Sequence, residues 1–111
     1  MSSPLISQAT PLAQLTVAAA GIGATYALVG TFSSSVIQLT IISTLDAAVQ
    51  VSFDGTNDHI AVPAGSTVPV YFPIDFKSNN SYLVKPKVFV KEIGNPAAGS
   101  LYISAFSAAI M

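Results

Sequence analysis

The stretch Val49–Val62, "VQVSFDGTNDHIAV", joins two short runs of β-type residues through an Asp-Gly pair. In the first run Val49, Val51 and Phe53 alternate with polar residues, which is the period of a strand with one buried face. Asp-Gly supplies the positive φ angle that tight hairpin turns require. The stretch therefore predicts a β-hairpin, with Phe53 and Ile60 resuming the inward face on either side of the turn.

The same letters could instead hold a metal ion or a catalytic centre, because they include two aspartates and the single histidine of the chain. A calcium loop counted from Asp54 would need glycine at its sixth position and glutamate at its twelfth, where this chain has His59 and Gly65. A lone histidine also lacks partners for a transition metal. We interpret the stretch as a turn and predict no metal site and no cofactor.

Similar β-rich runs separated by turn residues fill most of the remaining chain. The run 35–44 is apolar on both faces, as in a strand that is covered on both sides. The run 66–76 contains Pro69 and Pro73, which predict an edge strand. The spacing of these runs favours an all-β fold, a single antiparallel β-sandwich over residues 12–111 that is jelly-roll-like. Residues 1–11, with two prolines, are predicted to form an extended N-terminal arm.

The composition points to a subunit of an assembly. Only 8% of the 111 residues are charged, against about 25% in typical soluble domains, and the net charge is −1. Surfaces close to neutral tend to associate. We therefore expect this chain to pack against copies of itself or against another protein.

Several function classes fit the sequence poorly. Four lysines and no arginine cannot form the basic footprint of a nucleic-acid-binding protein. The apolar stretch Leu12–Gly30 is interrupted by polar residues and two close glycines, and no Lys or Arg before Lys77 would orient a membrane span. No G-x-S-x-G motif is present, and the carboxylates fall at strand ends or in loops. We expect neither a membrane protein nor an enzyme, and we predict no catalytic residue.

Two groups of residues are candidate partner contacts. The first group is apolar and lies in or next to the arm, and the second lies on one face of a predicted strand whose other face carries Val88 and Val90. The strand face that carries the second group is either a solvated sheet face or a weakly basic stripe that meets an acidic partner. The candidates are Leu5, Ile6 and Leu12 in the first group, and Lys85, Lys87, Phe89 and Lys91 in the second.

Two motifs stand out in the C-terminal half of the chain. The first is a "V-x-V-S-F-D-G-x-x-D-H" hairpin followed by a "P-A-G" loop, within Val49–Gly65. The second is a late "V-K…G…G-S-L-Y-I-S" hairpin, within Val88–Ser104. In these two motifs the chain resembles small structural proteins of tailed bacteriophages. The resemblance implies a component of the virion with a β-sandwich fold and without catalytic residues.

Our leading hypothesis is a capsid cement or decoration subunit on the capsid surface, a homo-oligomer that binds the major capsid protein or another virion protein. The alternative within the virion is a component of the neck, the tail or the fibre base. A rival of another class is a carbohydrate- or receptor-binding module. Such modules stack sugars on exposed aromatic rings, and this chain has no Trp, which leaves Tyr26, Tyr71, Tyr82 and Tyr102.

Overall fold

The computed structural model describes residues 6–32, 36–71 and 87–110. Within these ranges the chain forms β-strands and a single 3-10 turn, η1 (Ala19–Gly21). The strands are β1 (Ile6–Pro11), β2 (Leu15–Ala18), β3 (Ala27–Thr31), β4 (Val36–Ser43), β5 (Val49–Ser52), β6 (Ile60–Val62), β7 (Thr67–Tyr71), β8 (Lys87–Glu92) and β9 (Ser100–Ile110). The described part of the chain holds no helix that could cross a membrane.

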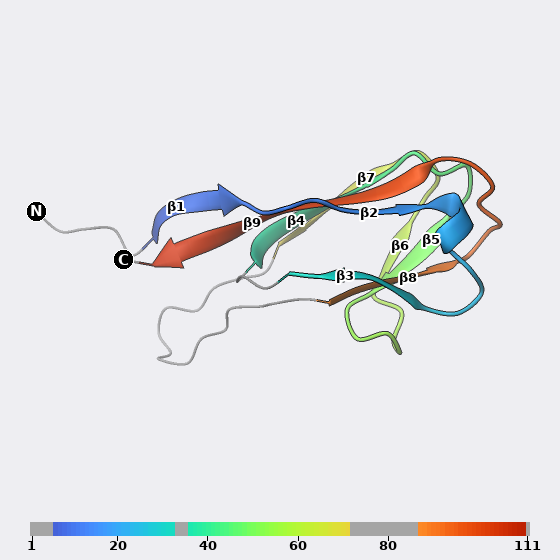
Figure 1. The fold of residues 1–111 in the computed structure, drawn as a ribbon, viewed down its shortest axis with the longest axis horizontal. Coiled ribbons are helices and arrows are strands. Elements are labelled where there is room, and N and C mark those ends of the chain that lie inside the picture. Colours follow the sequence, from blue (N-terminus) through green and yellow to red (C-terminus); the bar gives the residue numbers. More distant parts are fainter. Residues whose placement is uncertain (1–5, 33–35, 72–86, 111) are drawn as a thin grey trace, which may run out of the picture.

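The strands form two antiparallel sheets (Figure 1). Sheet A has the order β1-β9-β4-β7, and β2 pairs with β9 on the same side as β1. Sheet B has the order β3-β8-β5-β6. The all-β prediction is confirmed, and β7, which carries Pro69, lies at an edge of sheet A as predicted. Pro73 lies outside the described residues.

Four of the strand pairs are nested around the turn at residues 53–59. Moving outward from this turn, β5 pairs with β6, β4 with β7, β3 with β8 and β2 with β9. The chain therefore runs as one long hairpin that is folded over into two sheets. The partners along it include Val51↔Ile60, Leu39↔Val70, Ala27↔Val90 and Leu15↔Ile103.

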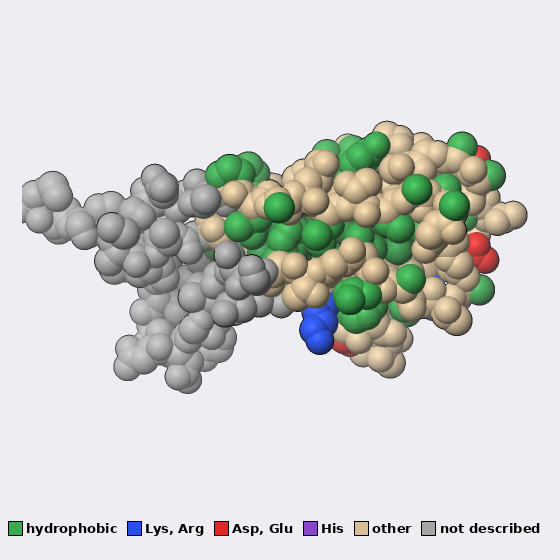
Figure 2. All heavy atoms as spheres, viewed as in Figure 1, with side chains coloured by type: hydrophobic (Ala, Val, Ile, Leu, Met, Phe, Trp, Pro, Cys, Tyr) green, Lys and Arg blue, Asp and Glu red, His purple; other side chains and the backbone are tan. Residues whose placement is uncertain are grey.

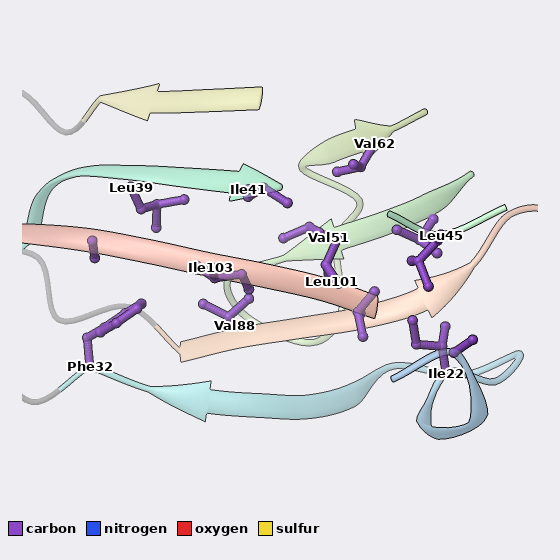
Figure 3. Close-up of a cluster of buried hydrophobic side chains, with 14 of the residues drawn as sticks. Ile22, Phe32, Leu39, Ile41, Leu45, Val51, Val62, Val88, Leu101 and Ile103 are labelled. Atoms are coloured by element: carbon purple, nitrogen blue, oxygen red, sulfur yellow. The ribbon is translucent and has the colours of Figure 1, made fainter. Parts of the chain in front are cut away.

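One hydrophobic core fills the space between the sheets. Inward side chains of β4 and β9 in sheet A point toward those of β5, β6 and β8 in sheet B (Figure 3). The alternation that the sequence predicts is present, because Val49, Val51, Val88 and Val90 are each 0% exposed. The largest fully buried side chains are Leu39, Ile41, Leu45, Leu101 and Ile103.

The sandwich is less completely closed along the side where edge strands β2 and β3 lie. Leu15 of β2 packs against the backbone of β3 so closely that a Cβ at Gly30 would lie 2.7 Å from a Leu15 methyl carbon. An apolar band is visible between these two strands on the face in Figure 2. Leu12, Leu15, Val17 and Val29 pack against the core here and are only partly buried.

At one end of the sandwich, the β4–β5 loop is tied to the loop before β9. Thr44 donates its backbone N–H to the carbonyl of Ser100 (2.9 Å), and its hydroxyl accepts the N–H of Ser100 (2.9 Å). The Asp46 carboxylate accepts the N–H groups of Ala97 (2.8 Å) and Ala98 (3.3 Å), which lowers the pKa of Asp46. These bonds fix the approach of the chain to β9.

The described part of the predicted arm is a strand rather than a separate segment. Residues Ile6–Pro11 form β1, which pairs with the C-terminal half of β9 from Pro11↔Phe106 to Ile6↔Ile110. The physical reason is that β9 is 11 residues long and β2 covers only Ser100–Ile103 of the edge opposite β4, so the rest of that edge offers backbone groups for pairing. Residues 1–5 lie outside the described part.

Candidate functional site

The β5–β6 turn, the first candidate site, is organised around the carboxylate of Asp54. Its Oδ1 accepts the N–H groups of Thr56 and Asn57, both at 2.8 Å, and the hydroxyl of Ser52 at 2.9 Å. Its Oδ2 accepts the Asn57 side-chain amide at 2.7 Å. These bonds, led by the N–H of Asn57, hold the pKa of Asp54 far below its usual value. Gly55 supplies the positive φ (78°), and Asn57 does not.

The rest of the turn is fastened to sheet B. His59 Nδ1 accepts the Phe53 N–H at 3.0 Å, and the two rings stack with centroids 5.7 Å apart. Asp58 accepts the hydroxyl of Tyr26 and pairs with Lys91 Nζ at 3.2 Å. Lys91 also lies 4.7 Å from the centre of the Tyr26 ring. Partial burial, the hydrogen bond to Asp58 and the nearby negative charges raise the pKa of Tyr26 to about 12.

These contacts give the turn a structural role. The oxygens of Asp54 are already occupied by donors from its own loop, and the His59 nitrogen nearest to it lies 3.9 Å away. No group of three His, Asp or Glu side chains that could hold a metal ion occurs among the described residues. The arrangement offers neither an open carboxylate nor a paired base and nucleophile.

The predicted lysine face is the outer face of β8, and the turn covers part of it. Val88 and Val90 point into the core, and Lys87, Phe89 and Lys91 point outward. A Cβ at Gly55 would lie 3.2 Å from the Phe89 ring, so the turn packs on Phe89, while Asp58 pairs with Lys91. Lys87 is exposed. The structure therefore brings Phe89 and Lys91 together as the base on which the turn sits.

The remaining predicted contact residues are less close to one another. Leu12 donates its N–H to the carbonyl of Ala105 (2.9 Å) and packs against the core of its own chain. Ile6 is the first residue of β1. Leu5 and Lys85 lie outside the described residues.

A different surface emerges from the distribution of charge over the two sheets. None of the five strands of sheet A contains Asp, Glu, Lys, Arg or His. The strand charges that the structure describes lie on β8, and further charges lie on the β5–β6 turn packed against it. Among the residues that the structure describes, the outer face of sheet B thus carries charged side chains and the outer face of sheet A does not.

The outer face of sheet A presents a grid of uncharged side chains across its strands. Register places Gln38 beside Tyr71 and Phe106, and Ile42 beside Thr67 and Tyr102. Tyr71 is 71% exposed and Phe106 is 39% exposed. The same register places Thr40 between Pro69 and Ser104 at the centre of the sheet. We call this uncharged outer surface of β2, β9, β4 and β7 the sheet A face.

Sequence reasoning missed the sheet A face as a unit. The pattern of the run 35–44 predicts cover on both sides, and β4 indeed carries Leu39 and Ile41 in the core. Its opposite side, including Ile42, is only half-buried and no described element lies over it. The sequence does carry a signal for this face, because no charged side chain precedes Asp46 or follows Glu92. Strands β1, β2, β4 and β9 of sheet A all lie in these two uncharged stretches.

Comparisons with protein-family models, with curated proteins and with solved structures found no match for this chain.

Proposed function

We propose that this protein is a non-enzymatic structural subunit of a bacteriophage virion, a capsid cement or decoration protein that stabilises the shell. The observation that carries the proposal is the sheet A face, which spans four strands without one Asp, Glu, Lys, Arg or His side chain. Fully solvated sheet faces usually carry charged side chains, and the centres of protein interfaces are depleted of them. The sheet A face is therefore suited to contact with a partner protein rather than to exposure to solvent.

The strand order supports a virion role through the kind of fold it forms. Sheets β2-β9-β4-β7 and β3-β8-β5-β6, with nested pairs around one hairpin, have the arrangement of two interlocked Greek keys. We therefore propose that the fold is a jelly roll. This fold is frequent in viral capsid proteins, although it also occurs in lectins and in other proteins, so it supports the function by analogy alone.

In this proposal the sheet A face meets the major capsid protein or another virion protein. Partner residues at its centre would contact Thr40 and Ile42, and exposed Tyr71 and Phe106 would act as apolar anchors. Tyrosine and phenylalanine are enriched at interfaces because they bury a large area with few rotatable bonds. The turn on sheet B remains toward solvent, where its charged groups stay hydrated.

The experiment compares two substitutions of the same kind on opposite faces. Thr40→Lys places a charge at the centre of the sheet A face, and Thr56→Lys places it on the exposed turn of sheet B. Burying an unpaired ammonium in an interface costs several kcal/mol, so T40K should lose attachment to purified particles. T56K should attach like the unmodified chain. Equal attachment of both variants would contradict the proposal.

Location on the particle separates the two virion alternatives. A shell subunit labels the whole capsid surface when a tagged chain is imaged on particles, while a neck, tail or fibre-base component labels one vertex or the tail. A shell location is the expected result.

One observation favours the rival function of carbohydrate binding, namely the exposure of Tyr71. Of the other candidate tyrosines, Tyr26 is engaged by Asp58 and Lys91, Tyr102 is half-buried, and Tyr82 lies outside the described residues. A stacking platform at Tyr71 would make Tyr71→Ala lose binding on a glycan array. We expect the unmodified chain to give no glycan signal, because its aromatic residues are dispersed over the grid.

A further inference from the structure

We propose that the open edge of β2 is a self-association site, where β2 of a second copy adds antiparallel to sheet A about a two-fold axis. This inference specifies the homo-oligomer within the proposed function, but it stands on the edge strands and does not require attachment to a particle.

The first step concerns the backbone groups that β2 leaves open. Ala19 donates its N–H to the carbonyl of Gly99 at 3.0 Å, and β2 pairs with β9 in regular register from Leu15↔Ile103 to Ala18↔Ser100. Since the direction of N–H and C=O groups alternates along a strand, those of Thr16 and Ala18 point away from β9. An edge of this kind can accept a further strand.

The second step compares β2 with the other edges of the two sheets. Edge strands of natural proteins are usually protected by proline, charge, bulges or brevity. β7 contains Pro69, β6 has three residues next to Asp58 and His59, and the register of β3 shifts between Leu28 and Gly30. β2 has four residues, but it has no proline, no charged residue and no register shift, and β1 continues its line along β9 from Phe106 to Ile110. It is the least protected edge in the described part of the chain.

The third step identifies the occupant. No charged side chain occurs in the first 45 residues, so an acidic or basic partner would find no counter-charge on β1, β2 or β3. A second copy meets this edge with equally neutral side chains and with the same alternation of donors and acceptors, which is self-complementary about a two-fold axis. The partly buried band of Leu12, Leu15, Val17 and Val29 beside the edge would be covered in the same event (Figure 2).

The test is the mass of the purified chain by sedimentation velocity over a range of concentrations, for the unmodified chain and two matched variants. Thr16→Lys and Thr67→Lys are the same change at exposed positions on opposite edge strands of sheet A. We expect a dimer, at twice the 11.4 kDa of one chain. T16K should weaken it about tenfold or more, since two-fold symmetry brings the two new charges together, while T67K should leave it unchanged.

Hydrogen exchange on the unmodified chain gives a second readout that does not depend on any variant folding. Exchange at the amide protons of Thr16 and Ala18 should slow as the protein concentration rises and the dimer becomes populated. Exchange at the amides of β7 should not change. A chain that stays monomeric, a dimer weakened by T67K rather than T16K, or unprotected Thr16 and Ala18 amides in the dimer would each overturn the inference. Particle attachment measured with T40K is separate, so the failure of one proposal is distinguishable from the failure of the other.

Discussion

Gly99→Ala should be strongly destabilising, because it combines two independent costs at the entry to β9. Gly99 has φ +92°, a conformation that an L-residue adopts only with strain of about 1–2 kcal/mol. A Cβ there would lie 2.1 Å from the carbonyl oxygen of Thr44, and that backbone is held in place by the paired bonds to Ser100. Overpacking of this kind adds about 1–3 kcal/mol. The expected loss in the free energy of unfolding is about 2–5 kcal/mol.

Two further glycines separate the two costs. Gly65 has φ +62° with open space around its Cβ position, so Gly65→Ala carries only the backbone strain of about 1–2 kcal/mol. Gly23 has neither a positive φ nor an atom within 4 Å of an added Cβ, so Gly23→Ala should be neutral or stabilise by up to about 1 kcal/mol.

Urea unfolding followed by far-UV circular dichroism gives the three free energies on one scale. The predicted order of stability is G23A, then G65A, then G99A, with G99A lowest by a margin larger than the strain alone. A G99A variant as stable as G65A would refute the reasoning, because the contact with Thr44 would then carry no cost.

Three other predictions concern the core, acid stability and the N-terminal strand. Leu101→Ala removes a fully buried side chain and should lower the free energy of unfolding by about 2–5 kcal/mol, as measured by urea unfolding; a loss below about 1 kcal/mol would contradict the proposed core. The pKa of Asp46 is lowered in the folded state, so its contribution to stability is present above the ordinary value of 3.8 and is lost as the pH falls through the lowered one. Thermal unfolding should therefore depend less on acid pH in Asp46→Asn, and an unchanged dependence would count against this role. Deleting residues 1–11 removes β1 from the edge of β9 beside the sheet A face, so attachment to particles should weaken while the sandwich stays folded by circular dichroism. Attachment equal to that of the full chain would refute a role for this segment.

Much of the strand pattern can be predicted from the sequence because each strand is marked locally. Alternation at 49–51 and at 87–91 follows the core-facing and outward-facing sides of β5 and β8, and glycine or proline separates most runs. Ser52 departs from the pattern, because this polar residue is 0% exposed. The sequence did not predict β1 as a strand, because its residues do not alternate between apolar and polar and include a proline. Its strand state depends on the edge of β9, at the opposite end of the chain.

The arrangement of strands in sheets could not be read locally, and neither could the sheet A face. Thr40 lies beside Ser104 and Pro69 only because β4 is placed between β9 and β7. Low total charge predicted an associating surface, but which face is uncharged depends on which strands share a sheet. The turn at 53–59 was the reverse case, since its Asp-Gly pair and its polar side chains act within the loop itself.

The most direct test of the central claim is hydroxyl-radical footprinting of this chain, free and in purified particles of the phage whose capsid it is proposed to cover. The account predicts that Tyr71, Tyr102 and Phe106 on sheet A become protected in the particle. Tyr26 and His59, which lie beside sheet B, should be labelled as in the free chain. Absence of the chain from the particles, or equal labelling of the sheet A aromatics in both states, would contradict it.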